Sequence, residues 1–385
     1  MRQALRATLA CMLVGFTFCL PVAAGAATLV VEPGQGLAQV LQTAADGDTI
    51  ELLPGDYRGE VAVILQKRLV LRGVGARPVL HADGRHAEGK AILVVRDGDI
   101  TIENIEFRGA RVPDGNGAGI RFEKGRLLVR RCAFVDNENG ILTANFGDAE
   151  LTVEDSEFGP AVIGPRLPHL LYVGRIAHFT LSGSRLHGGH SAHLVKSRAR
   201  ENHVRYNQLV DGPGGRAAYE LEFPNGGVAY VVGNVIGQTA DTTNPALLSF
   251  GAEGAVDDRE QALVMAHNTL INEGVRPGLF VHLHAARLQR EVATRYVNNL
   301  SLGFGVGELG LADITQGNFT ATTAVLQDVA AGHYTLGRSA WLRGRGVDPG
   351  MARGVPLAPQ AEFTPPAGTR PLAPRTRWSP GAYQD

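Results

Sequence analysis

Side chains of the types that do acid–base chemistry gather in one stretch of this chain, between residues 187 and 227. Four of them are candidates for acting directly on a reacting bond: Lys196, Arg198, Glu220 and Glu222. A neutral lysine can accept a proton, and an arginine can neutralise a carboxylate. The two glutamates can hydrogen-bond hydroxyl groups or chelate a cation, and Ca²⁺ favours such oxygen ligands. The stretch therefore predicts a catalytic site, with Glu220 and Glu222 as candidate Ca²⁺ ligands.

Further polar residues in and beside this stretch are candidates for binding a ligand. They are Tyr172, His190, His193, Arg200, Arg216, Asn225 and Ser249. The competing interpretation is structural, because a lysine over a glutamate on neighbouring strands can be an exposed ion pair that contributes only about 0–1 kcal/mol. The concentration of charges in so short a stretch favours the functional interpretation.

An internal repeat indicates the elements that must position these side chains. A short β-branched run, a polar residue that is often asparagine, and a large apolar residue recur along the chain. The copies are TIENIEF (101–107), LVRRCAF (128–134), TVEDSEF (152–158), LSGSRL (181–186), VRYNQL (204–209), VVGNVI (231–236) and VMAHNTL (264–270). Their final apolar residues are spaced by 27, 24, 28, 23, 27 and 34 residues.

A near-constant period of strands without helical periodicity is typical of a β-solenoid, whose units bury their apolar faces only by stacking. We therefore predict an all-β fold, a right-handed parallel β-helix over residues 27–310. A β-sandwich or barrel would alternate strands at shorter spacing. The asparagines of the repeat are expected to be structural, with their amides bonded to the backbone in turns. They are Asn202, Asn207, Asn234, Asn268, Asn298 and Asn299.

Strand alternation and the repeat together predict which candidate side chains meet. In 218–223 the odd-numbered residues are expected on one side, and Glu220 and Glu222 on the other. Lys196 is expected to point outward, because burying an ammonium group is costly.

Counted from the preceding apolar anchors, Lys196 follows Leu186 by 10 residues and Glu220 follows Leu209 by 11. We therefore expect Lys196 and Glu220 nearly stacked on adjacent coils, with Tyr172 one coil earlier and Ser249 one coil later.

The two ends of the chain differ from the repeat. Residues 34–45 are expected to form a short amphipathic helix that caps the open end of the solenoid, an arrangement that resembles the opening of many parallel β-helix proteins. Residues 311–385 are Pro-rich and lack the repeat. We expect an irregular tail packed along the solenoid, and a flexible linker is the alternative.

The first residues predict export. Arg2 and Arg6 precede an apolar run over 9–20, and Ala24-Gly25-Ala26 fits a signal-peptidase site, so 1–26 is expected to be a signal peptide. The apolar run is shorter than the roughly 20 residues that span a bilayer, and no later segment offers a membrane span. We therefore expect a periplasmic or secreted protein. Its one remaining thiol, Cys132, cannot form a disulfide within the chain.

Composition excludes one class of partner and favours the predicted fold. The formal net charge is −1 and aromatic residues are 6% of the chain, with no basic stripe, which argues against nucleic acid. The 49 glycines fit an all-β chain with many tight turns. We expect a monomer.

One set of residues carries a family resemblance: Lys196-Ser197, Asn202, Asn207-Gln208-Leu209, Gly212, Gly227 and Gly233-Asn234. It resembles the polysaccharide lyase family of alginate lyases and chondroitinase B, which are right-handed parallel β-helices of the wider pectate-lyase superfamily. The resemblance implies that Lys196 is a base. In that family an Arg-His-Gly on the next coil supplies the acid, whereas this chain has Glu222-Phe223-Pro224-Asn225-Gly226 there, so the acid is not carried over.

These observations favour a polysaccharide lyase that cleaves an acidic glycan by β-elimination. Two alternatives stay open. A hydrolase or epimerase could use the same groove, because Glu220 and Glu222 on one strand face would lie about 6.5–7 Å apart. A polysaccharide-binding solenoid without catalysis is the other, since this fold alone does not determine function.

Overall fold

The computed structural model describes residues 25–164, 167–242, 244–307 and 313–384. The expected signal peptide therefore lies outside the described residues except for Gly25 and Ala26. None of the described helices is long and apolar enough to cross a membrane.

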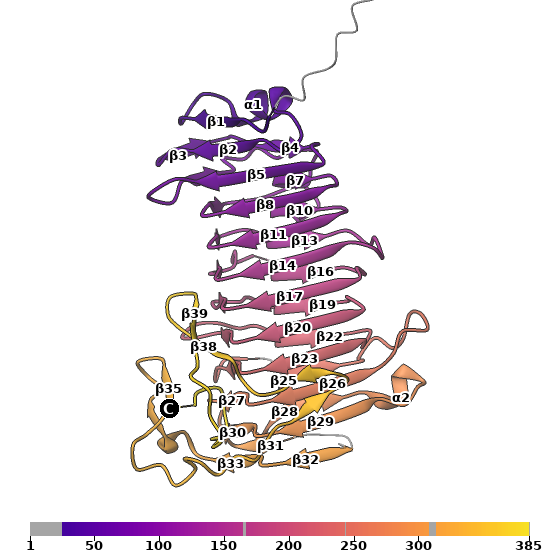
Figure 1. Ribbon diagram of the computed structural model, residues 1–385, viewed down its shortest axis with the longest axis vertical. Coiled ribbons are helices and arrows are strands. Elements are labelled where there is room, and N and C mark those ends of the chain that lie inside the picture. The colour runs from indigo at the N-terminus through magenta and orange to yellow at the C-terminus, as the bar shows by residue number, and fades with distance from the viewer. Residues whose placement is uncertain (1–24, 165–166, 243, 308–312, 385) are drawn as a thin grey trace, which may run out of the picture.

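Three long parallel sheets run the length of the molecule and coil around one core (Figure 1). The twelve-stranded sheet contains β1 (Thr28–Val31), β2 (Thr49–Leu52), β5 (Arg68–Gly73), β8 (Asp99–Glu103), β11 (Arg126–Arg130), β14 (Glu150–Glu154), β17 (His178–Ser182), β20 (Glu201–Arg205), β23 (Val228–Val232), β26 (Ala262–Ala266), β29 (Ala293–Val297) and β32 (Ile314–Gln316). The eleven-stranded sheet contains β3 (Asp56–Arg58), β6 (Val79–His81), β9 (Glu106–Arg108), β12 (Ala133–Val135), β15 (Glu157–Phe158), β18 (Arg185–Leu186), β21 (Gln208–Val210), β24 (Val235–Gln238), β27 (Thr269–Asn272), β30 (Leu300–Gly303) and β33 (Phe319–Ala321).

The ten-stranded sheet carries the candidate site. It contains β4 (Ala62–Ile64), β7 (Ala91–Val95), β10 (Ala118–Phe122), β13 (Asn139–Thr143), β16 (His169–Val173), β19 (His193–Ser197), β22 (Tyr219–Phe223), β25 (Ala246–Phe250), β28 (Gly278–Leu283) and β31 (Gly305–Val306). Each coil contributes one strand to each sheet in turn, so the prediction of a right-handed parallel β-helix is confirmed. The last coil extends to Ala321, beyond the expected boundary at residue 310.

The apolar anchors of the repeat form one continuous column in the core. Phe107, Phe134, Phe158, Leu186, Leu209, Ile236 and Leu270 are register partners in succession through the eleven-stranded sheet. The rings of Phe107 and Phe134 stack with centroids 5.2 Å apart, and those of Phe134 and Phe158 are 4.5 Å apart. The sequence repeat therefore gave the coil register correctly, because each anchor buries its apolar surface only against the anchors above and below it.

The asparagines of the repeat are structural, as predicted. Each of the six donates its side-chain amide to a backbone carbonyl. Asn207, Asn234, Asn268 and Asn299 also stack as a ladder. In it the Oδ1 of each of the last three accepts from both the backbone and the side chain of the asparagine before it. This ladder satisfies the buried polar groups of one turn through successive coils.

A helix covers the N-terminal end of the solenoid. The expected capping helix is present as α1 (Leu37–Thr43), which buries Leu37 and Leu41 against the first coils. A one-turn helix, α2 (Ala285–Leu288), follows β28.

The C-terminal tail forms a short 3₁₀ turn (Thr323–Val325) and three antiparallel hairpins, and it lies along the side of the coils (Figure 1). The hairpins are β34 (Leu326–Asp328) with β35 (His333–Leu336), β36 (Met351–Ala352) with β37 (Val355–Pro356), and β38 (Ala361–Phe363) with β39 (Thr369–Pro371). Its last part is anchored by buried groups, since Gln384 Nε2 lies 3.0 Å from His267 Nδ1, and the backbone N–H of Ala382 donates to Thr269 Oγ1 over 2.9 Å.

Candidate functional site

A row of side chains runs across the outer face of the ten-stranded sheet, one from each coil. Tyr172 of β16 is the register partner of Lys196 of β19, which is the partner of Glu222 of β22. Glu222 in turn pairs with Ser249 of β25. Tyr172 lies one coil before Lys196, and Ser249 lies one coil after Glu222, so both residues are on the coils where they were expected. The expected partner of Lys196 was Glu220, and the structure shifts that pairing by two residues.

The prediction that Glu220 shares an outward face with Glu222 is wrong. Glu220 is 1% exposed and lies two residues before Glu222. The residues at the same place on the other coils, two before Tyr172, Lys196 and Ser249, are Leu170, Leu194 and Leu247. All three leucines belong to the hydrophobic core. Simple alternation fails here because two consecutive residues, such as Glu220 and Leu221, are both buried. Tyr219 is correspondingly turned outward, where its ring stacks on His193 with centroids 5.1 Å apart.

Burial and the negative charge of Asp211 raise the pKa of Glu220 well above its ordinary value. Its Oε1 is shielded from solvent and has no hydrogen-bond partner among the described residues. Glu220 and Glu222 therefore neither form one cation site nor flank one bond. Among the described residues, no group of three or more acidic, histidine or cysteine side chains is arranged to hold a metal ion.

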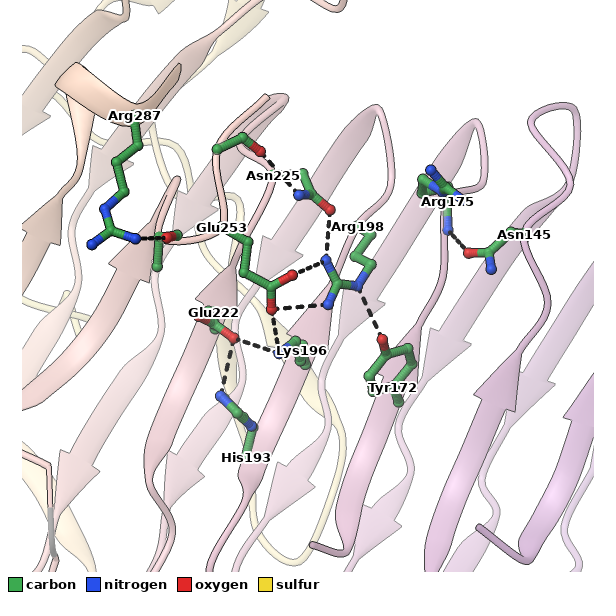
Figure 2. Close-up of polar contacts among 12 residues, drawn as sticks. Asn145, Tyr172, Arg175, His193, Lys196, Arg198, Glu222, Asn225, Glu253 and Arg287 are labelled. Atoms are coloured by element: carbon green, nitrogen blue, oxygen red, sulfur yellow. Dashed lines mark hydrogen bonds and ion pairs between the residues drawn. The ribbon is translucent and has the colours of Figure 1, made fainter. Parts of the chain in front are cut away.

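Two cations and two carboxylates form a closed network at the centre of the row (Figure 2). Lys196 Nζ lies 3.2 Å from Glu222 Oε2 and 3.0 Å from Glu253 Oε1. Arg198 donates to both oxygens of Glu253, over 2.7 and 2.9 Å. It also donates from Nε to the Tyr172 hydroxyl over 3.0 Å and from Nη1 to Asn225 Oδ1 over 2.7 Å.

The sequence interpretation missed Glu253. This residue lies in the loop after β25, more than 50 residues from its partners, and the loop folds back so that the Glu253 N–H donates to the carbonyl of Pro224 over 2.8 Å. Hydrogen bonds from Arg198 lower the pKa of Glu253 to about 2, and Lys196 adds to the effect. The only sequence signal was the longer spacing of 34 residues between repeats, which indicates an insertion but not its direction.

Glu222 is the more buried of the two carboxylates, with a side chain that is 4% exposed. Burial by itself raises its pKa, but hydrogen bonding to His193 and the charges of His193 and Lys196 outweigh burial and leave the pKa lowered. His193 Nε2 lies 3.0 Å from Glu222 Oε2. We therefore assign Glu222 as the anion that holds Lys196 and His193 together.

Aromatic rings line the same face beside the charged network. His169, His193 and Tyr219 form a continuous stack, with His169 and His193 centroids 5.0 Å apart. His169 also meets Tyr172 edge to face. Burial lowers the pKa of His169 to about 3, and the cationic neighbours add to that effect, so this ring is neutral at physiological pH.

The remaining sequence candidates divide into those in the network and those outside it. Asn225 belongs to the network, because its amide joins Arg198 to the carbonyl of Gly254. Ser249 lies on the row, fully buried, and its Oγ has no hydrogen-bond partner among the described residues.

Three candidates lie away from the network. Arg200 follows β19 and pairs with Asp257 at 3.3 Å. His190 and Arg216 face each other in an isolated bridge in the turns that precede β19 and β22, at the opposite end of these strands from Arg198. The predicted ligand-binding role of these three residues stays a prediction.

The three parallel sheets, to each of which every coil adds one strand, define the class of this protein: a parallel β-helix. No family model matches the sequence, and no curated protein matches it significantly. Among solved structures, the chain is similar to the crystal structure of pectate lyase Pel9A, with a TM-score of 0.61 and 12% identity over 93% of this chain and 96% of that chain. A second structure, ORF18 of Geobacillus virus E2, has a TM-score of 0.42 and 13% identity over 76% of this chain and 61% of that chain. At these identities the first likeness shows the fold alone.

Proposed function

We propose that this protein is a polysaccharide lyase that cleaves an acidic glycan by β-elimination. The observation that carries the proposal is the placement of Lys196 and Arg198, two residues apart on one outward face, with side chains joined through a shared carboxylate. A lyase needs one group that neutralises a uronate carboxylate and one that removes the neighbouring proton. The pectate-lyase-like fold supports this choice by analogy only.

In the proposed reaction Arg198 binds the uronate carboxylate and Lys196 is the base. Lys196 first releases its own proton to solvent, so that its neutral amine is the base. The C5–H bond then breaks and its proton passes to the Lys196 amine, the C4–O bond breaks, and a C4=C5 double bond forms. The leaving oxygen takes a proton from water, which balances the proton that Lys196 released. Tyr172 and Asn225 hold the guanidinium in place, because each accepts a hydrogen bond from it.

The closed network sets a condition on substrate binding. Lys196 and Arg198 carry two positive charges, and Glu222 and Glu253 balance them. A substrate carboxylate must therefore displace Glu253, the more exposed of the two, whose side chain is 43% exposed. This displacement frees Lys196 from one of its two carboxylates and brings the substrate beside it.

A glycan-binding protein without catalysis is the second candidate, and the charge balance of the network favours it. A lysine held between two carboxylates is a good ion-pair partner and has to be released before it can act as a base. A hydrolase that uses Glu220 with Glu222 is disfavoured, because the two side chains do not share a face.

The test is an assay of the purified protein on polygalacturonate, alginate and glycosaminoglycans. We expect near-ultraviolet absorbance from an unsaturated product, and loss of at least about 100-fold in rate for Lys196→Ala. The matched control is Lys67→Ala, since Lys67 forms an ion pair with Asp97 at 2.7 Å away from the row. New reducing ends without that absorbance would indicate hydrolysis, and glycan binding with neither signal would indicate the binding protein.

We also propose that the protein acts outside the cytoplasm, in the periplasm or the medium. The support is the basic, apolar and small-residue pattern of residues 1–26. Mass spectrometry of the protein recovered from each fraction tests this, because export predicts a chain that begins near residue 27.

A further inference from the structure

A second cation lies on the outward row, three coils before Lys196. Arg121 of β10 pairs in register with Leu142 of β13, and Leu142 pairs with Tyr172. The row therefore reads Arg121, Leu142, Tyr172, Lys196 along the outer face of the ten-stranded sheet. Strands in a sheet are about 4.8 Å apart, so the three coils from Arg121 to Lys196 correspond to about 14 Å along the solenoid. Arg198, two residues after Lys196, is displaced from this row by a further roughly 6.6 Å.

The charges around Arg121 do not balance, in contrast to those around Lys196. Lys90 and Arg96 flank β7, the strand beside β10, and both bind Glu123, with Lys90 Nζ 2.6 Å from Oε1 and Arg96 Nη1 2.5 Å from Oε2. The same two cations also pair with Glu88. Three cations therefore meet two carboxylates, and the excess is one positive charge.

The excess charge belongs to Arg121. Both oxygens of Glu123 are already engaged, and no hydrogen bond or ion pair joins the Arg121 guanidinium to another described residue. Its Nε is shielded from solvent without a partner, although the residue as a whole is only half-buried. A shielded, unpaired cation costs free energy, so such a group is usually satisfied by a ligand or by water.

We propose that Arg121 binds a second anionic group of the same polymer whose first carboxylate meets Arg198. The surface between the two cations suits a sugar chain, because Leu142 and Tyr172 offer apolar and aromatic surface to the C–H faces of sugar rings. A sugar residue is about as long as one strand spacing, so the separation spans about three sugar residues. The polymer is therefore one that carries an acidic group repeatedly along its length. This inference rests on the proposed glycan substrate but not on its cleavage.

The test compares short and long ligands from the same polymers. Binding of uronate disaccharides and hexasaccharides is measured by calorimetry for the wild type, Arg121→Gln and Arg126→Gln. Arg126 is the matched control, because it forms an exposed ion pair with Asp99 at 2.9 Å on the twelve-stranded sheet. Circular dichroism melting of each variant checks that the fold is intact.

Loss of one charged hydrogen bond is expected to weaken hexasaccharide binding by about 10- to 100-fold in Arg121→Gln, with disaccharide binding unchanged. Equal hexasaccharide affinity in Arg121→Gln and the wild type would overturn the proposal, as would an equal loss for both ligand lengths. Length-dependent binding without an unsaturated product would refute the lyase and support the Arg121 site. Absence of binding to every uronate ligand would overturn both.

Discussion

The buried carboxyl of Glu220 leads to a quantitative prediction about stability. Its equivalents on the neighbouring coils are Leu194 and Leu247, so the position accepts a leucine. Glu220 Oε1 lacks a partner, and an unsatisfied buried polar group costs about 1–3 kcal/mol. Glu220→Leu is therefore expected to raise the free energy of unfolding by about 1–3 kcal/mol at neutral pH.

The increase in the free energy of unfolding of Glu220→Leu over the wild type should depend on pH. The direction of that dependence follows from the raised pKa of Glu220. The folded state holds this proton more tightly than the unfolded chain, so the stability of the wild type is full below the ordinary pKa of 4.5 and falls as pH rises through the folded-state value. The leucine variant lacks this loss. Its advantage over the wild type should therefore grow from acidic to neutral pH.

Guanidinium chloride unfolding is followed by circular dichroism at a series of pH values. It measures the difference in stability between Glu220→Leu and the wild type, and the change of that difference with pH. Asp211 remains in the variant and interacts with Glu220 in the wild type, so the difference between variant and wild type reports Glu220 together with its coupling to Asp211. A lower unfolding midpoint for Glu220→Leu, or a difference that does not change with pH, would refute this reasoning.

Two further predictions concern the network and the asparagine ladder. Glu253→Gln should lower the Kd for uronate oligosaccharides several-fold, because a neutral amide competes less strongly than a carboxylate for Arg198. Calorimetry measures this Kd, and weaker binding by the variant would contradict the proposed displacement of Glu253 by the substrate. Asn234→Ala should lower the free energy of unfolding by about 2–5 kcal/mol, since it removes four hydrogen bonds and leaves the buried Asn207 N–H without its side-chain acceptor. An unchanged denaturation midpoint in that variant would show that the ladder contributes no net stability.

The register of the core anchors could be predicted from the sequence, whereas the predicted pairing of Lys196 in the ten-stranded sheet was two residues off. The inward or outward direction of single residues could be predicted only in part. Lys196 points outward as expected. Glu220 was misassigned because alternation assumes that neighbouring residues face opposite sides, whereas in this strand Glu220 and Leu221 are both buried after the outward Tyr219. A ladder of leucines at the equivalent positions, such as Leu170 and Leu194, was the signal that could have corrected it.

The sequence alone determined the architecture, because stacked coils require the same residue types at the same place in every turn, and that requirement is visible as a repeat. It also determined that Lys196 lies beside Tyr172, since both positions are counted from core anchors. Only the tertiary structure decided that Glu253 closes the network and that Arg121 is left without a partner. The position of Glu253 depends on how the loop after β25 folds back over the sheet, and the state of Arg121 depends on which carboxylates already bind other cations. Neither the path of a loop nor the pairing of charges repeats with the period of the coils, so the sequence repeat does not reveal them.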